Sequence, residues 1–185
     1  MASARSPGDW GGITSPAPAF DFMNFITRIW RSSVGKKFIM ALTGCALFLF
    51  VIGHLVGNLQ IFLGPDALNR YGHFLQSNME IVWPVRLGLL GCVVLHVLAA
   101  ARLSAENKAA RPVGYEGDPN PIAASYASRT MLMSGLIIAA FIVYHLLHYT
   151  VLVKTLNLSG QDFAGFQDEK GRHDIYRMLI VGFQQ

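Results

Sequence analysis

The stretch Met40-Ala-Leu-Thr-Gly-Cys-Ala-Leu-Phe-Leu-Phe-Val-Ile-Gly-His54-Leu decides the fold, together with a second stretch that closely matches it, Met131-Leu-Met-Ser-Gly-Leu-Ile-Ile-Ala-Ala-Phe-Ile-Val-Tyr-His145-Leu. Each is an apolar run with a histidine near its end. Apolar runs of this kind are typical of helices that cross a bilayer. A histidine inside such a helix is costly in lipid, so it indicates a function.

The composition supports a membrane protein. Apolar residues make up 52% of the chain and charged residues only 14%, which argues against an ordinary soluble domain. The excess of basic residues flanks the apolar runs instead of forming one stripe with aromatic residues, so we do not expect a nucleic acid partner. Cys45 and Cys92 stand alone within apolar runs, and we interpret both as small buried hydrophobes.

Three runs are long enough to span the hydrocarbon core. We expect membrane-spanning helices at about residues 38–63, 81–101 and 131–153, and the start of a further helix at about 175–185. The expected fold class is therefore an all-α integral membrane helical bundle.

The N-terminal part precedes these helices. Residues 1–19 are rich in Pro, Gly, Ser and Ala, and we expect a mobile tail followed by a single transmembrane domain over residues 20–185. Residues 20–30 have the pattern of a short amphipathic helix lying in the membrane interface. The same pattern also suits a helix packed on a partner protein.

Basic residues predict the orientation. They precede the first run and fill the loop between the second and third runs, whereas the first loop holds only Arg70 before Arg86. By the positive-inside rule, the N-terminus is cytoplasmic and the protein lies in the cytoplasmic membrane of the cell. The basic residues of the two flanks are Arg28, Arg31, Lys36, Lys37, Arg102, Lys108, Arg111 and Arg129.

Helix rise gives each histidine a depth. His54 lies 17 residues beyond Lys37 and His145 lies 16 residues beyond Arg129, so both sit roughly 25 Å from the cytoplasmic edge. Two histidines at one depth on two helices can hold a haem iron between their imidazoles. The alternative for any one of them is a structural hydrogen bond across helices.

His96 does not share that depth. It precedes Arg102 by 6 residues, which places it about 9 Å from the cytoplasmic edge and roughly 15 Å from the other two. It therefore needs another use: a second haem with a further partner, a proton or quinone contact, or a local hydrogen bond.

The remaining histidines have weaker patterns. His148 lies one turn beyond His145, and we expect it to contact a haem propionate, a quinone or water. His73 and His173 fall in outer polar segments, where we expect solvated side chains. Four glycines offer small surfaces for a flat porphyrin or for helix packing, namely Gly53, Gly57, Gly88 and Gly91.

Several short motifs occur in order along the chain. They are Arg31-Ser-Ser-Val-Gly-Lys-Lys37, Met40-Ala-Leu-Thr-Gly44, Gly53-His-Leu-Val-Gly-Asn-Leu59, Ala67-Leu-Asn-Arg-Tyr71 and Asp174-Ile-Tyr-Arg-Met178. Over about residues 28 to 185 the chain resembles the cytochrome b-558 membrane subunit of succinate dehydrogenase and fumarate reductase. That family has five transmembrane helices, two b haems held by four histidines, and a cytoplasmic flavoprotein and iron-sulfur subunit that exchange electrons with quinone.

The resemblance implies roles for individual residues. His54 and His145 match the ligands of the haem farther from the cytoplasmic subunits, and His96 matches one ligand of the nearer haem. Arg177 matches a basic position near haem propionates. The family's fourth ligand lies on the next helix, which this sequence does not include, so the sequence carries three of the family's five helices. Either it is a fragment of a longer chain, or it is a three-helix version that holds one haem and leaves His96 without its partner.

The resemblance also implies a quinone site. Such a site needs a hydrogen-bond donor or proton carrier at an apolar cleft, and Glu80 is the best proton carrier unless it only pairs with Arg86. Dicarboxylate chemistry is expected on the partner subunits, because this chain has no dinucleotide fingerprint and no cysteine cluster. The quinone candidates are Ser33, Lys37, His73, Glu80 and Arg86.

Two other functions stay open at this point. One is a haem-free anchor that docks a partner through its basic face. The other is a small transporter whose intramembrane histidines relay protons.

Overall fold

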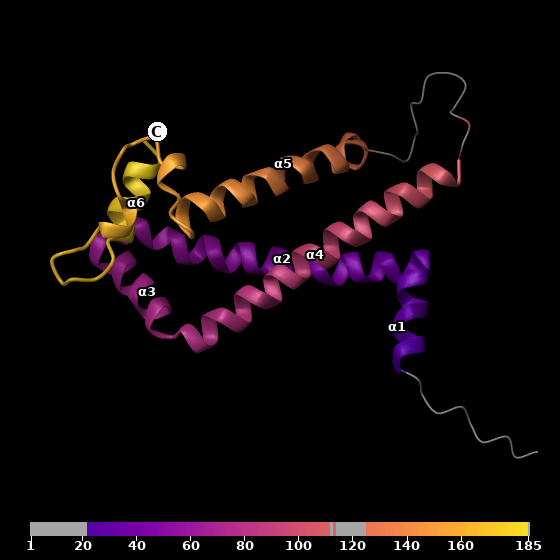
Figure 1. The fold of residues 1–185 in the computed structure, drawn as a ribbon, viewed down its shortest axis with the longest axis horizontal. Coiled ribbons are helices and arrows are strands. Elements are labelled where there is room, and N and C mark those ends of the chain that lie inside the picture. The colour runs from indigo at the N-terminus through magenta and orange to yellow at the C-terminus, as the bar shows by residue number, and fades with distance from the viewer. Residues whose placement is uncertain (1–21, 112, 114–124, 185) are drawn as a thin grey trace, which may run out of the picture.

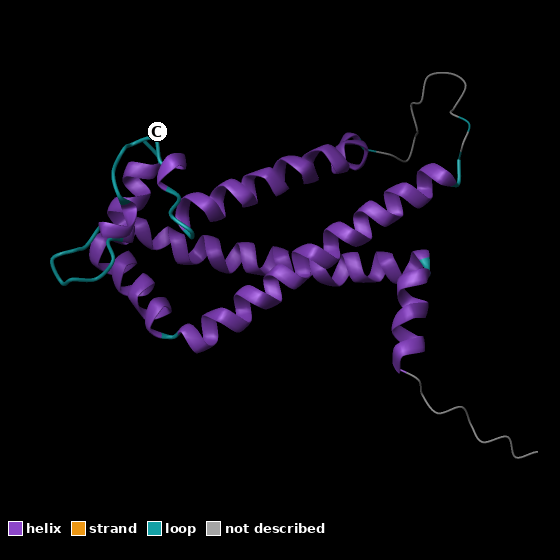
Figure 2. Cartoon of the chain, viewed as in Figure 1, coloured by secondary structure: helices purple, strands orange, loops and turns teal. Residues whose placement is uncertain are grey.

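The computed structural model describes residues 22–111, 113 and 125–184, and every regular element within them is helical (Figures 1 and 2). The expected tail at 1–19 lies outside the described residues. The α-helices are α1 (Phe22–Arg31), α2 (Ser33–Asn58), α3 (Pro65–Ser77), α4 (Met79–Ala109), α5 (Tyr126–Tyr149) and α6 (Ile175–Gly182). Short 3₁₀ turns are η1 (Leu59–Leu63), η2 (Lys154–Leu156) and η3 (Phe163–Gly165).

Three helical segments are long and apolar enough to cross a membrane: Ser33–Leu63, Met79–Ala109 and Tyr126–Tyr149. Their large apolar side chains point outward, and the described residues bury only six hydrophobic side chains. Exposing such a surface to water is unfavourable, whereas lipid chains can cover its apolar side chains. The all-α fold with three candidate spans is thus confirmed, and a lipid bilayer is the environment that it suits.

The helix limits differ from those expected. α4 extends to Ala109, eight residues past the apolar run, because Ala, Leu, Glu and Lys favour helix after the hydropathy has fallen. α5 begins at Tyr126, where the Ser125 hydroxyl accepts a hydrogen bond from the Ser128 amide. It ends at Tyr149, just before Leu152 adopts a left-handed backbone with φ 58°. α3 was not expected, since its sequence is largely polar.

α1 meets α2 at a sharp corner (Figure 1). Ser32 ends α1 and caps α2, because its hydroxyl accepts a hydrogen bond from the Gly35 amide at 2.8 Å. A side chain at Gly35 would overlap the Ile29 carbonyl, so the corner requires glycine. The expected amphipathic helix is confirmed as a helix; whether lipid or a protein covers it stays a prediction.

α2 and α4 cross as a packed pair, while α5 approaches α2 only near its C-terminal end (Figure 1). We call the end that holds α1 the α1 end, and the opposite end the α3 end. Cys92 is half-buried, but Cys45 is exposed, so the expectation that both are buried was wrong for Cys45. A cysteine facing lipid needs no protein neighbour.

Residues 150–174, which we call the strap, lead from α5 back to α6 at the α3 end. Phe163, Phe166 and Met178 form a buried cluster that joins the strap to α6 and to Tyr149 of α5. Asp174 caps α6 by accepting a hydrogen bond from the Arg177 amide at 3.0 Å. The strap is therefore folded against α5 and α6, although it has little regular structure.

Asn69 fastens the strap to α3. Its side chain is 1% exposed, and its amide nitrogen donates to Asp174 at 3.0 Å and to Asp168 at 3.4 Å. Its amide oxygen accepts from the backbone N–H of Tyr176 at 2.9 Å. A buried amide with all these partners rigidifies the contact, and it would be costly to replace.

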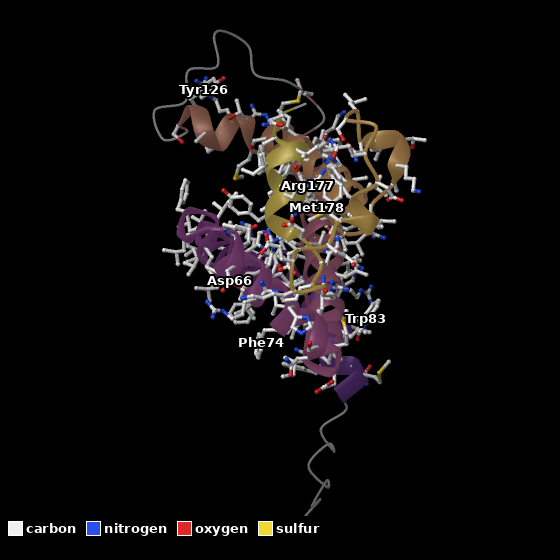
Figure 3. The ribbon with its side chains drawn as sticks, turned by 90° about the vertical axis from the view of Figure 1, so that its left-hand side faces the viewer. Asp66, Phe74, Trp83, Tyr126, Arg177 and Met178 are labelled. Atoms are coloured by element: carbon white, nitrogen blue, oxygen red, sulfur yellow. The ribbon has the colours of Figure 1, made fainter. Side chains whose placement is uncertain are left out.

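Charged residues add a second attachment, near the labelled Asp66 in Figure 3. The Asp66 carboxylate on α3 accepts from Lys170 at 2.7 Å and from Arg172 at 2.8 Å, and Arg172 also pairs with Asp168. These hydrogen bonds lower the pKa of Asp66 to about 2.

Replacing Asn69 by alanine should loosen the strap. The substitution removes three hydrogen bonds from a buried site, a loss of roughly 1–3 kcal/mol. We expect faster hydrogen exchange at the Tyr176 amide in detergent-solubilised protein. The control is Asn78→Ala, since Asn78 donates only to Phe74 within its own helix end. Equal exchange in both variants would contradict the assignment.

The Asp66 attachment should weaken in acid. Because the folded pKa lies below the ordinary value of 3.8, the stabilisation is present above that value and is lost as the pH falls toward about 2. Protease cleavage within the strap should rise over this range with an acid-active protease. With a protease that is active at neutral pH, Asp66→Asn should be cleaved within the strap more readily than the wild type; a variant that stays as resistant as the wild type would refute the attachment.

Candidate cofactor site

His54 of α2 and His145 of α5 meet at the α3 end. Their ring centroids lie 5.8 Å apart and their planes are at 88°. Each ring stacks on a phenylalanine four residues earlier on its own helix, Phe50 at 5.4 Å and Phe141 at 5.7 Å. The two apolar runs thus bring the same Phe and His pair together, and the two histidines expected at one depth lie in contact. Their role as haem ligands stays a prediction.

A cavity of about 460 Å³ opens beside the two histidines. That volume is within the range of small-molecule and cofactor sites. Its walls come from α2, α3, α4, α5 and α6, with residues of the strap between α5 and α6. The described polar and small residues of its lining include His54, His145, Arg86, His173, Tyr71 and Gly57.

The histidine spacing suits a metal between two imidazoles. Bonds of about 2 Å from each nitrogen to the metal hold the coordinating atoms roughly 4 Å apart. Ring centroids lie somewhat farther out than those atoms, so 5.8 Å is of the right size. Within the described part of the chain, no group of three or more His, Cys, Asp or Glu could hold a metal by itself. Two imidazoles alone would suit an iron that brings its other ligands with it.

Only one of the four expected glycines lines this cavity. A Cβ at Gly57 would lie 2.8 Å from the Tyr71 hydroxyl, so the glycine lets α3 approach α2 there. A Cβ at Gly53, Gly88 or Gly91 would meet no other described residue within 4 Å. Those three glycines consequently present open surface, and their use for a porphyrin stays a prediction.

Two basic residues join the histidines. Arg86 of α4 lines the cavity, with its guanidinium carbon 5.5 Å from the centroid of the Trp83 ring. His173 of the strap also lines it, and its Nε2 lies 2.9 Å from the carbonyl oxygen of Phe163. His173 is thus half-buried, and not fully solvated as expected, because the strap folds over the α3 end. Groups of this kind suit an anionic substituent such as a propionate.

His96 lies elsewhere, at the crossing of α2 and α4. Its Nδ1 is 3.1 Å from the Thr43 hydroxyl oxygen, and its ring is close to Gly44. Thr43 precedes His54 by 11 residues on α2, which is a separation of about 16 Å along the membrane-spanning axis. This agrees with the depth difference expected for His96.

The Thr43 hydroxyl is the hydrogen-bond partner of His96 across the two helices. A hydroxyl has one proton, and the Ile39 carbonyl accepts it at 2.7 Å. When the Thr43 proton goes to Ile39, its oxygen can accept a hydrogen bond from an Nδ1–H of His96, and Nε2 then keeps its lone pair. A histidine that donates through one nitrogen and ligates through the other is the usual arrangement at metal sites.

His148 is buried away from the cavity. Its side chain is 1% exposed and packs on Tyr149 at 4.3 Å and Phe163 at 5.5 Å. Neither ring nitrogen has a hydrogen-bond partner among the described residues. The structure thus places this ring in the apolar cluster that joins α5 to the strap, and its contact with a propionate, quinone or water stays a prediction.

The structure brings one quinone candidate to the cavity, namely Arg86. Ser33 and Lys37 are exposed at the start of α2, and His73 is exposed on α3. Glu80 is exposed in the first turn of α4, and the described contacts include no ion pair between it and Arg86.

Arg177 stands on α6, as labelled in Figure 3. Its guanidinium lies 4.5 Å from the centroid of the Phe166 ring and donates to Gln161 at 3.3 Å. The neighbouring Met178 and Leu179 line the cavity, whereas Arg177 does not. Its role near a propionate stays a prediction.

Sequence reasoning missed Tyr71 and His173 as cavity residues. Tyr71 reaches the cavity because α3 packs on α2 at Gly57, and His173 reaches it because the strap folds over the α3 end. Neither contact has a signal in the apolar periodicity of the sequence. No family model, no curated protein and no solved structure matches this chain.

Thr43→Val should destabilise the crossing of α2 and α4. It removes the hydrogen-bond partner of the His96 Nδ1, and interhelical hydrogen bonds in membranes contribute roughly 0.6–1.7 kcal/mol. We expect a lower midpoint of thermal unfolding in detergent. Thr130→Val is the matched control, because the Thr130 hydroxyl bonds only to carbonyls of its own helix. Equal midpoints would contradict the contact.

Proposed function

We propose that this chain is the membrane-anchoring cytochrome b subunit of a succinate:quinone oxidoreductase, working as a succinate dehydrogenase or a fumarate reductase. The observation that carries the proposal is the contact between the His54 and His145 rings, whose centroids lie 5.8 Å apart, beside a cavity of about 460 Å³. The ordered motifs that resemble the family are the second support.

In this proposal His54 and His145 would hold a b haem through its iron. Arg86 and His173 are positioned to balance the charge of its propionates, and Phe50 and Phe141 hold the two imidazole rings by stacking. When bound, the haem would supply one-electron transfer, and the residues of this chain would hold it and set its surroundings.

His96 extends the proposal to a second haem. With the proton on Nδ1, its Nε2 lone pair is available as a ligand, and its site lies about 16 Å from the first one along α2. The second ligand of that haem would come from outside the described residues. Two such sites would let electrons pass between a partner subunit at the α1 end and quinone in the membrane.

The partner subunits follow from the resemblance. A flavoprotein and an iron-sulfur subunit would dock at the basic α1 end on the cytoplasmic side, and would carry the dicarboxylate chemistry. The chain itself would contribute the anchor, the haem ligands and part of a quinone site.

A reduced-minus-oxidised absorbance spectrum tests the haem. The purified wild-type protein, prepared with haem supplied, should show a b-type difference that is lost in His54→Ala and in His145→Ala. Leu49→Ala and Ile138→Ala are the controls, because these exposed residues lie on the same two helices, outside the cavity lining. A colourless wild type would refute the haem, and would favour the haem-free anchor or, if proton flux appeared in liposomes, the transporter.

His145→Met separates ligation from folding. Methionine is an axial ligand in other haem proteins and raises the reduction potential relative to bis-histidine ligation. The variant should keep a haem spectrum with a more positive midpoint potential. An unchanged potential would show that His145 does not ligate the iron.

A further inference from the structure

A second pocket lies at the α1 end, about 190 Å³ in volume. Three helices form it: α1 supplies Trp30 and Arg31, α2 supplies Lys36, and α4 supplies Arg102 and Glu106. It is separate from the histidine cavity, which lies at the opposite end of α2.

Lys36 is the fixed centre of this pocket. Its side chain is 4% exposed, and its ammonium group pairs with Glu106 at 2.8 Å. It also donates to the backbone carbonyls of Trp30 at 3.2 Å and Arg31 at 3.5 Å. These contacts hold the ends of α1 and α4 around the start of α2, so the pocket is built by the fold.

The pocket has an excess of positive charge. Three cations, Arg31, Lys36 and Arg102, face one carboxylate, Glu106, which leaves a formal charge of +2. Glu106 is engaged by Lys36, whereas the structure gives the guanidinium groups of Arg31 and Arg102 no hydrogen bond or ion pair with a described residue. Two guanidinium groups beside one pocket favour an anion with several oxygen atoms, such as a phosphate.

The surroundings indicate that the phosphate belongs to a lipid. Leu95 and Leu98 lie seven and four residues before Arg102 on one face of α4, and they are 45% and 47% exposed. An acyl chain could follow this apolar face toward the bilayer centre while its headgroup stays at the guanidinium groups. Trp30 is half-buried at the same level, as is usual for tryptophan at the membrane interface. The pocket is also smaller than typical sites for larger organic ligands.

We propose that this pocket binds the phosphate headgroup of an anionic phospholipid, with Arg31 and Arg102 as the phosphate donors. Basic pockets between transmembrane helices bind such headgroups by the same chemistry. The site depends on the membrane environment of the chain and not on haem binding.

Native mass spectrometry of the full chain, released from detergent after addition of phosphatidylglycerol, tests the site. The wild type should retain phosphatidylglycerol in preference to phosphatidylcholine. The double variant Arg31→Gln/Arg102→Gln should bind phosphatidylglycerol roughly tenfold more weakly or worse. It keeps the Lys36–Glu106 pair, and circular dichroism checks that its helices remain.

The matched control is Arg28→Gln/Lys108→Gln, which removes the same charge from the same two helices outside the pocket. It should change the affinity by less than about twofold. Glu106→Gln gives a test of opposite sign: removing the one carboxylate should strengthen binding. Equal loss in the control, or no loss in the double variant, would overturn the proposal. Inorganic phosphate that competes as well as the lipid would show a phosphate site instead of a lipid site.

Discussion

The attachment of the strap to α3 through Asn69 is the interaction on which the histidine site depends. α5 has no extended contact with α2 or α4, so helix packing alone does not fix its position. The strap is joined to Tyr149 of α5 through Phe163 and Phe166, and it is joined to α3 through Asn69 and Asp66. Since α3 follows α2 directly, these polar contacts set where His145 lies relative to His54. The polar contacts of Asn69 and Asp66 at the α3 end thus determine how His54 and His145 lie relative to each other within the apolar helices.

The apolar runs predicted the three long helices because lipid imposes one simple requirement, about twenty apolar residues in a helix. Hydropathy indicates which residues lie in the hydrocarbon core, and a helix can continue beyond that core. The predicted end of α4 was therefore eight residues too early. It also gave no signal for α3. That helix is held by Pro65 at its start, by the Gly57–Tyr71 and Gly72–Ile175 contacts and by Asn69, all of which are tertiary or local features without a hydropathic period.

The part of the candidate site that could be predicted from the sequence is the depth of its histidines in the membrane. Counting residues from the basic flanks put His54 and His145 at one level and His96 at another, and the contacts of the three rings agree with this. The depth of a residue does not show toward which side of its helix the side chain points. It also does not show where a segment outside the helices, such as the strap, folds. For that reason His148, one turn from His145, was expected near a cofactor although its ring turns into the Phe163 cluster. For the same reason His173 was expected in solvent although the strap brings it to the cavity.

α2 relates the polar features of the molecule to one another. Along this single helix Lys36 is followed by Thr43 after 7 residues and by His54 after 11 more, which spaces them by about 10 Å and 16 Å. Each of these positions contacts another helix: α4 at the first two and α5 at the third. At each of these positions the neighbouring helix carries a polar group at a matching depth: Glu106 opposite Lys36, His96 opposite Thr43 and His145 opposite His54. Under the proposed function, the same spacing sets how far an electron would travel between the level of His96 and that of the facing histidines.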